Sequence, residues 1–381
     1  MSKLQKGYLL IADISGYTMY LSESELEHAE KTLTALLELL VEHTQPPLII
    51  SRLEGDAVIS YGLRDNFFKG QTFVEIIENT YVAFRKTIEL LVLNTTCKCN
   101  ACANISTLDL KFFFHYGSFA IQHISNHDEL VGSDVNLIHR LLKNDVREET
   151  GFKAYTLYTD AAIQQLHLEE ISATMTPHKE TIEHLGEVQV WVQDMHSVWE
   201  QKRSESQIEI PPERIADKLE IDIGIPPELV WDYLTQPKFR NILVGSDRQE
   251  ITNRSNGRIA SGSVYQCYHG DMVIPQTILE WQPFERMVIL QLIPLPFSDT
   301  SILIDCQLVP IKEGTRFVQA ASKARGPLLG RVLFDYVMGP LTSKSVEKRT
   351  EEFKQRIEED FLAKRGDLPD QAEFGEVRLG E

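Results

Sequence analysis

The chain lacks any long hydrophobic run, and this absence limits where the protein works. No stretch of its 381 residues approaches the roughly 20 consecutive apolar residues that a bilayer-crossing helix requires. The start of the chain leads directly into a strand-like run, so we expect no secretory leader. We therefore expect a cytoplasmic protein with no membrane span.

Positive charge is also scarce. The chain has 38 Lys and Arg residues against 56 Asp and Glu residues, which gives a formal net charge of −18. Such an acidic chain is not a general nucleic-acid binder, and we expect no nucleic-acid partner. The hydrophobic fraction of 43% and the charged fraction of 25% are typical of a folded protein, and the length favours two domains.

Cysteine is rare and unevenly placed. The chain has five cysteines, an odd number, and without a secretion signal we expect no disulfide framework. Cys267 and Cys306 lie in strand-like patterns, so we expect them to be small core residues. The other three, Cys97, Cys99 and Cys102, are close enough in sequence to bind one soft metal ion.

The first part of the chain alternates strand-like and helical patterns. An apolar run over 7–14 predicts a buried strand, and apolar residues at three- and four-residue steps over 23–44 predict a helix. Two β-prone runs, 48–53 and 57–61, flank a glycine-containing turn and predict a hairpin. Further helices are predicted over 72–94, 135–143 and 160–166, and further strands over 108–116, 119–124, 155–158 and 188–192. This order predicts an α+β sandwich.

A change in composition divides the chain. We predict one domain over 1–196, a polar linker over 197–214, a second domain over 215–364 and a disordered tail over 365–381. In the second domain the patterns predict an opening strand, a helix beginning near Pro226, four or five strands over 262–321 and a closing helix over 329–362.

Two acids stand where strands of the first domain end. Asp13 follows the first apolar run, and Asp56 lies at the tip of the predicted hairpin. If the strands are neighbours, the two carboxylates come together and suit Mg²⁺ or Mn²⁺, because these ions prefer oxygen ligands and neutralise the mutual repulsion. In the alternative interpretation, Asp13 caps a turn and Asp56 only forms one.

Four motifs in order resemble the catalytic domain of class III adenylate and guanylate cyclases, over residues 7–193. They are IADISGYT at 11–18, RLEGDA at 52–57, HYGS at 115–118 and VGSDVNLIHR at 131–140. The resemblance implies a ferredoxin-like α/β sandwich of the class III cyclase type. It also implies a homodimer that binds ATP or GTP in two shared sites.

The resemblance assigns roles to residues. Asp13 and Asp56, assisted by the Ile14 carbonyl, would bind two Mg²⁺ or Mn²⁺ ions per site. The backbone N–H groups near the phosphates would be those of Ser15, Gly16, Tyr17 and Thr18.

The last motif contributes two further residues. Asn136 and Arg140 are four residues apart on one helical face, so both can point at one site, where they would orient the ribose and stabilise the transition-state phosphate. The alternative is a helix-start hydrogen bond for Asn136 and a solvated surface charge for Arg140.

The chain departs from the family at two places. Arg52 and Glu129 stand at the purine contacts, where adenine-selective members carry Lys and Asp, so donor and acceptor remain and ATP is expected over GTP. The late phosphate-contacting lysine is absent from Glu183-His184-Leu185, a loss of about 2–4 kcal/mol of transition-state stabilisation. The alternative function is therefore a catalytically weak or inactive nucleotide-binding module coupled to a lipid- or small-molecule-binding domain. A third interpretation is an interaction scaffold in which neither domain binds a small molecule.

The cysteine cluster predicts a structural Zn²⁺ site that needs a fourth ligand. Candidates are His43, His115, His127 or a residue of another subunit. The alternative is three reduced thiols on a surface loop.

The second domain resembles the START-like, or polyketide-cyclase-like, helix-grip superfamily. The resemblance rests on IPPELVWDYLT at 225–235, followed by the predicted sheet and long closing helix. It implies an apolar cavity for a hydrophobic small molecule, and the candidate lining residues are Trp281, Phe297 and Phe334. The alternative is a filled core without a ligand.

Overall fold

The structure is a computed structural model, and the chain divides into two compact units, Met1–Glu205 and Ser206–Glu381. In the part of the chain that it describes, every helix is too short or too polar to span a bilayer. The described residues are 4–22, 25–63, 70–94, 99–124, 127–183, 185–204, 208–254, 257–295 and 298–366.

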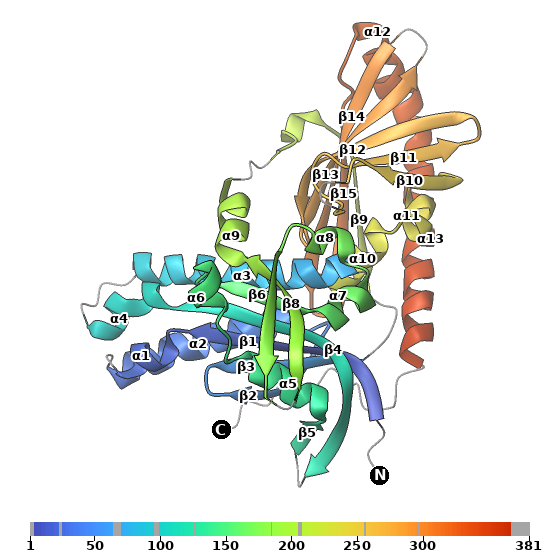
Figure 1. Cartoon of the computed structure of the whole chain (residues 1–381). Helices are drawn as coiled ribbons and strands as arrows, with labels where there is room; N and C mark the ends of the chain where they lie inside the picture. The colour runs from blue at the N-terminus through green and yellow to red at the C-terminus, as the bar shows by residue number, and fades with distance from the viewer. Residues whose placement is uncertain are drawn as a thin grey trace. The chain divides into compact units, whose positions relative to one another are not determined.

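Unit 1 is built on a mixed sheet (Figure 1). Its strands follow the order β2-β3-β1-β4-β6-β8-β7, and β5 pairs with β4 off this path. All pairs are antiparallel except β4 with β6. The strands are β1 (Leu4–Ser15), β2 (Ile49–Glu54), β3 (Ala57–Leu63), β4 (Asp109–Ile124), β5 (His127–Val131), β6 (Tyr155–Thr159), β7 (Thr176–Ile182) and β8 (Gly186–Asp194).

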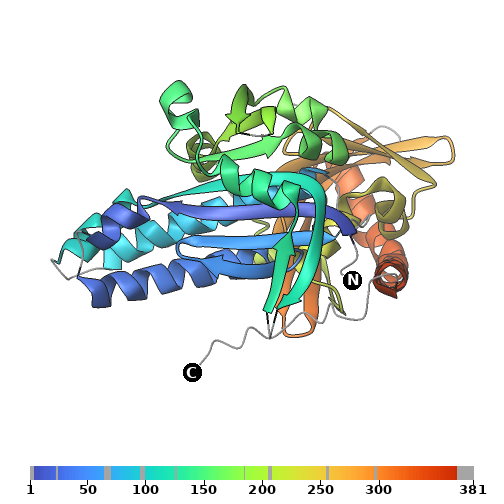
Figure 2. The same ribbon diagram turned by 60° about the horizontal axis from the view of Figure 1, so that its bottom comes forward.

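Helices cover both faces of this sheet (Figure 2). Because side chains alternate along a strand, Leu10 and Ala12 of β1 pack in the core with α2 and α3, whereas Leu9 and Ile11 pack with α5. The helices are α1 (Tyr17–Ser22), α2 (Leu26–Thr44), α3 (Gly70–Asn94), α4 (Asn100–Asn104), α5 (Ser133–Leu141), α6 (Val146–Thr150), α7 (Asp160–Leu166), α8 (Glu169–Ser172) and α9 (Met195–Ser204), with a 3₁₀ turn η1 (Ile105–Thr107).

The predicted α+β class of unit 1 is confirmed, with two differences in its strands. The strands predicted over 108–116 and 119–124 are one strand, β4, because β1 pairs with it continuously from Ser15↔Asp109 to Leu4↔Ala120. Strand β7 was not predicted at all. Its buried positions include the polar residues His178 and Glu180, which hydrogen-bond to each other at 2.9 Å, so the sequence shows no apolar alternation there.

Unit 2 is an antiparallel seven-stranded sheet with a long C-terminal helix. The strand order is β10-β11-β12-β13-β14-β15-β9. The strands are β9 (Ile215–Ile223), β10 (Arg248–Thr252), β11 (Val264–His269), β12 (Met272–Gln282), β13 (Arg286–Leu295), β14 (Ser298–Ile311) and β15 (Gly314–Ser322). The helices are α10 (Pro227–Thr235), α11 (Pro237–Val244), α12 (Leu328–Leu333) and α13 (Gly339–Gly366), with the 3₁₀ turn η2 (Pro212–Arg214) and the π-helical turn η3 (Phe334–Met338). Membership in the START-like superfamily stays a prediction.

The closing helix differs in detail from the prediction. The single helix expected over 329–362 consists of α12, η3 and α13. Pro340 has no backbone N–H to donate to the preceding turn, and Gly339 N–H donates to the Phe334 carbonyl five residues back, which is the π pattern. At the other boundary, α9 runs to Ser204, into the segment predicted as a linker, and the tail over 367–381 lies outside the described residues.

Candidate metal and nucleotide site

The structure places Asp13 and Asp56 side by side. Strands β1 and β3 are antiparallel neighbours with Asp13 opposite Ala57, the residue after Asp56. The Ile14 N–H donates to the Asp56 carbonyl at 3.1 Å, which fixes the hairpin turn against the end of β1. Gly55 takes φ +65° in this turn, a backbone conformation that glycine adopts without strain. The two acids are therefore brought together as the sequence predicted.

Both carboxyl groups are perturbed by their surroundings. Burial raises the pKa of Asp13 to about 6, with a further contribution from the negative charge of Asp56. Burial also raises the pKa of Asp56. A half-buried pair of acids is costly to ionise without a cation, and the available donors are all oxygens. This donor set fits Mg²⁺ or Mn²⁺.

Lys111, which was not predicted from the sequence, also lies at this site. It lies directly opposite Asp13 in the pairing of β1 with β4, and its positive charge lowers the pKa of Asp13 against the effect of burial. Burial lowers the pKa of Lys111, and its Nζ stands 5.1 Å from the ring centroid of Tyr155. The one available signal is a single charge inside the apolar run Leu110–Phe114.

The predicted phosphate-binding segment follows Asp13 after one residue, Ile14. Ser15 ends β1, Gly16 forms the turn, and Tyr17 and Thr18 begin α1. The Tyr20 N–H donates to the Gly16 carbonyl at 2.9 Å, so the turn is tied to the short helix. The phosphate-binding role of these four residues stays a prediction.

Asn136 and Arg140 lie exposed on α5, on one face as predicted. Arg140 Nη1 donates to the Glu183 carbonyl at 3.1 Å and lies 3.9 Å from the Glu183 carboxylate. Within the described residues, no hydrogen bond or ion pair joins Asn136 or Arg140 to Asp13 or Asp56. One chain therefore does not assemble all four residues by direct contact.

The HYGS and VGSDVN segments form one packed unit. A Cβ atom on Gly117 would lie 2.5 Å from the Cβ of Asp134, so only glycine leaves room for this aspartate. Asp134 Oδ2 accepts from the Ser118 N–H at 2.6 Å, and its other oxygen is 3.5 Å from His115 Nε2. The second nitrogen of His115 is 2.8 Å from Thr159 Oγ1. These contacts fix the start of α5, and with it the position of Asn136, on the sheet.

Arg52 and Glu129, the predicted purine contacts, are also brought together. Arg52 Nη1 of β2 forms an ion pair with Glu129 Oε2 of β5, and Arg52 Nη2 lies 3.3 Å from Glu54 Oε2. In this structure the guanidinium of Arg52 and the carboxylate of Glu129 are therefore paired with each other. The turn between β7 and β8 carries Glu183 and Leu185, whereas His184 lies outside the described residues.

The cysteine cluster contacts a histidine that is not among the predicted ligands. His28 Nδ1 of α2 lies 3.2 Å from Cys99 Sγ and 3.7 Å from Cys102 Sγ, and the three ligand atoms all lie within 4.8 Å of one another. Cys97 lies outside the described residues. No sequence signal marks His28, which is 71 residues from Cys99.

The histidines that were expected to complete the cluster fall elsewhere. His115 is buried in the sheet and held by Thr159 and Asp134, so it is not available to the thiols. His43 lies in the last turn of α2, at the opposite end of that helix from His28. The His127 side chain is outside the described part of the structure. The histidine at the cluster is His28.

Comparison with known proteins gives two sequence matches. A family model described as "Protein of unknown function (DUF2652)" matches residues 33–150. The "Uncharacterized protein Rv2561/Rv2562" of Mycobacterium tuberculosis (strain ATCC 25618 / H37Rv) is 30% identical over 158 residues, which cover 41% of this chain and 69% of the relative. The chain belongs to the family of Rv2561/Rv2562. The stretch matched by the family model includes Asp56, Asn136 and Arg140.

Solved structures give further similarities over about half of the chain. The guanylyl cyclase Cya2 is 13% identical, with coverage of 50% of this chain and 92% of that chain and a TM-score of 0.38. The adenylyl cyclase CyaB from P. aeruginosa is 14% identical, with coverage of 50% and 95% and a TM-score of 0.36. The guanylyl cyclase domain of the RhoGC fusion protein from Blastocladiella emersonii is 16% identical, with coverage of 50% and 97% and a TM-score of 0.34.

Proposed function

We propose that unit 1 is a nucleotidyl cyclase that converts ATP, and GTP less readily, into a cyclic nucleotide and pyrophosphate. The observation that carries this proposal is the half-buried pair Asp13 and Asp56, fixed between the end of β1 and the turn before β3. The four motifs that resemble class III cyclases support it, because the pair lies in the first two of them.

Asp13 and Asp56, with the Ile14 carbonyl, would bind two Mg²⁺ or Mn²⁺ ions. Such ions lower the pKa of the ribose 3′-hydroxyl and neutralise charge on the leaving pyrophosphate. Lys111 neutralises part of the charge of Asp13 from the neighbouring strand. The N–H groups of Ser15 to Thr18, at the end of β1 and the start of α1, would serve as donors for phosphate oxygens.

The rest of each site would come from a second copy of the chain in a homodimer. Arg140 would offer its guanidinium to a phosphoryl oxygen. Its hydrogen bond to the Glu183 carbonyl already restricts the side chain, so less conformational entropy would be lost on binding. Asn136 would hold the ribose. Arg52 and Glu129 would exchange their mutual ion pair for a donor and an acceptor on the purine edge.

A second candidate function is nucleotide binding without turnover. The turn between β7 and β8 places an acid, Glu183, where the resembled family carries a cationic residue, and this acid contacts Arg140. One fewer cation at the phosphates favours a slow or inactive site.

The two functions are separated by a direct assay of the purified chain. ATP and GTP are each supplied with Mn²⁺ or Mg²⁺, and the products are resolved by chromatography. A cyclase gives a cyclic product that disappears in Asp56→Asn. A nucleotide-binding module gives metal-dependent nucleotide binding, measured by calorimetry, without a cyclic product.

The shared-site geometry has its own test. Asp56→Asn and Arg140→Ala are each inactive alone, but mixing and reassociating them in equal amounts gives heterodimers with one intact site. Half of the dimers are then mixed, so the mixture regains about a quarter of the natural activity. An inactive mixture, with heterodimers demonstrated by native mass spectrometry, would exclude sharing between chains.

Unit 1 would also hold one structural Zn²⁺ ion on His28, Cys99 and Cys102. One imidazole and two thiolates within 4.8 Å match the nitrogen and sulfur ligands that zinc prefers. The ligands come from α2 and from the start of α4, so the ion would fasten two segments that are distant in sequence.

A further inference from the structure

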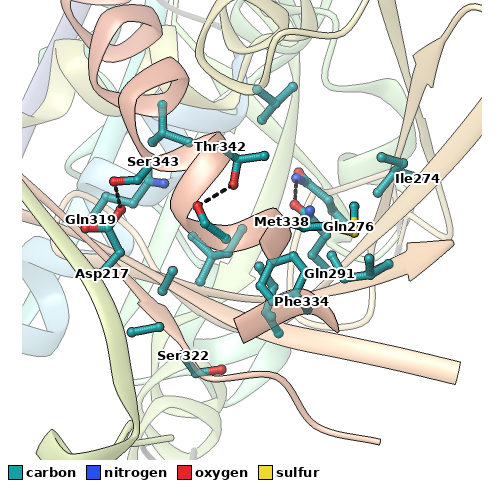
Figure 3. A pocket seen from close by; sticks show the side chains of 18 of the residues that line it. Asp217, Ile274, Gln276, Gln291, Gln319, Ser322, Phe334, Met338, Thr342 and Ser343 are labelled. Carbon is teal, nitrogen blue, oxygen red and sulfur yellow. Dashed lines mark hydrogen bonds between the residues drawn. The ribbon is translucent and has the colours of Figure 1, made fainter. Parts of the chain in front are cut away.

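Unit 2 contains a cavity of about 700 Å³, within the range of small-molecule sites. It lies between the sheet and the helical segments α11, η3 and the beginning of α13 (Figure 3). Its walls are mainly apolar and include Leu219, Leu243, Ile274, Ile293, Ile304 and Phe334. Of the aromatic residues expected to line a cavity, Phe334 does so, Trp281 packs instead against Trp231 at 4.7 Å between ring centroids, and Phe297 lies outside the described residues.

One charged side chain of this cavity is fully enclosed. Arg240 of α11 is 2% exposed. Its Nη2 donates to Gln276 Oε1 at 2.9 Å, and its guanidinium lies 4.6 Å from the ring centroid of Tyr265. Its Nε and Nη1 are buried and have no hydrogen-bond partner among the described residues. Gln276 is held in turn by Gln291 at 2.7 Å, a contact visible in Figure 3. The guanidinium is therefore positioned with two donors to spare.

No acid neutralises Arg240 within the described residues. The two acids that line the cavity are engaged elsewhere: Asp217 accepts from Ser343 at 2.7 Å, and Asp335 accepts from the Ala324 N–H at 2.7 Å.

The neighbouring thiols do not supply the missing charge either. Burial raises the pKa of Cys306 to about 12 and also raises the pKa of Cys267, so both are neutral near pH 7. A buried cation without an anion is strongly unfavourable, and two unpaired donors on it add to the imbalance.

We propose that this cavity binds an organic carboxylate with an apolar body, whose carboxylate pairs with the guanidinium of Arg240. A guanidinium forms charged hydrogen bonds with a carboxylate. Among the described residues that line the cavity, Arg240 is the fully buried cation, whereas the half-buried Arg349 donates to the Val244 and Ser345 carbonyls. The apolar walls accommodate an alkyl chain or aromatic rings. This site lies wholly in unit 2 and is independent of the activity proposed for unit 1.

The test uses the full-length chain, freed of co-purified lipids on a hydrophobic resin. Calorimetry measures the binding of dodecanoate and of 2-naphthoate, which separates an alkyl from an aromatic body. Dodecanol and 2-naphthol are the uncharged counterparts. We expect at least one acid to bind, and to bind about 10- to 100-fold more tightly than its alcohol, as a charged hydrogen bond of this kind predicts.

The Arg240→Met variant should lose this preference and bind acid and alcohol equally. Arg248→Met is the matched control, because Arg248 is an exposed arginine of unit 2 that does not line the cavity. If Arg240→Met does not fold, the acid-over-alcohol preference of the natural chain remains decisive, with Ile304→Trp as a second variant that fills the cavity and should abolish binding. Equal binding of acid and alcohol to the natural chain, or no binding of either acid, would overturn the proposal.

Discussion

The two units each hold charge away from water without complete neutralisation, but the charges have opposite signs. In unit 1 the acids Asp13 and Asp56 lie at the end of a strand, beside backbone N–H groups and one lysine. In unit 2 Arg240 is enclosed by apolar walls. The sign of the charge indicates the sign of the missing ligand, and the surroundings indicate its chemistry. The acids suit a metal ion with its phosphates, whereas the arginine suits an acid with an apolar body.

The largest effect is expected when one acid of unit 1 is removed, and it tests whether the two units hold separate sites. Asp13→Asn should reduce formation of the cyclic product about a thousandfold, because it would remove a ligand of the proposed metal ions. Mn²⁺ titration should show weakened binding, while dodecanoate binding to unit 2 stays unchanged. Glu42→Gln, an exposed acid of α2, is the control and should leave both measurements as they are. Full activity in Asp13→Asn would remove the acid pair from the mechanism.

The next effect concerns the proposed zinc ion. His28→Ala should abolish the one equivalent of zinc measured by mass spectrometry and lower the free energy of unfolding by about 4 kcal/mol, the stabilisation from a ligand at a thousand times its Kd. His43→Ala should retain both the metal and the stability. A natural chain that is purified without zinc and takes up none at micromolar concentration would contradict the site.

A smaller effect is expected from a half-buried acid of unit 2, Glu228. Burial raises the pKa of Glu228 from its ordinary value of 4.5 to about 7, and its Oε2 has no hydrogen-bond partner in the part of the chain that the structure describes. Between pH 4.5 and 7 the unfolded chain ionises this group before the folded chain does, so the free energy of unfolding falls as the pH rises. This loss of stability is complete above the folded pKa.

Glu228→Gln stays neutral and should therefore be as stable as the natural chain at pH 4. Above pH 8 it should be more stable, by up to about 3 kcal/mol. Urea unfolding across this pH range measures the difference, and the exposed Glu313→Gln is the control. A difference that does not change with pH would show that Glu228 is ionised normally in the folded state.

The smallest expected effect refines the electrostatics of unit 1. Lys111→Met removes a positive charge opposite Asp13, so Mn²⁺ should bind about fivefold more tightly, equivalent to about 1 kcal/mol. Lys153→Met removes an exposed charge and should change the affinity little. Weaker Mn²⁺ binding in Lys111→Met would mean that the lysine positions the acids and does not compete with the metal.

The features that could be predicted from the sequence are those that short local patterns determine. Asp13 and Asp56 follow recognisable strand and turn signals, so their meeting needed only one assumption about neighbouring strands. Lys111, His28 and Arg240 acquire their roles from contacts made by distant segments, such as the 71 residues between His28 and Cys99. A pattern read along the chain carries no information about such pairs. Strand β7 was missed for a related reason, because buried His178 and Glu180 satisfy each other and hide the alternation.

The close fit of Gly117 against Asp134 ties together two segments that a reader of the sequence would treat as separate motifs. A side chain at position 117 requires a shorter residue at position 134, and a shorter residue there releases the Ser118 N–H and His115. The two positions should therefore change together among homologues, or not at all. If the two positions co-vary across the family of Rv2561/Rv2562, the pair would identify the homologues in which α5, and with it Asn136, is packed on the sheet as it is here.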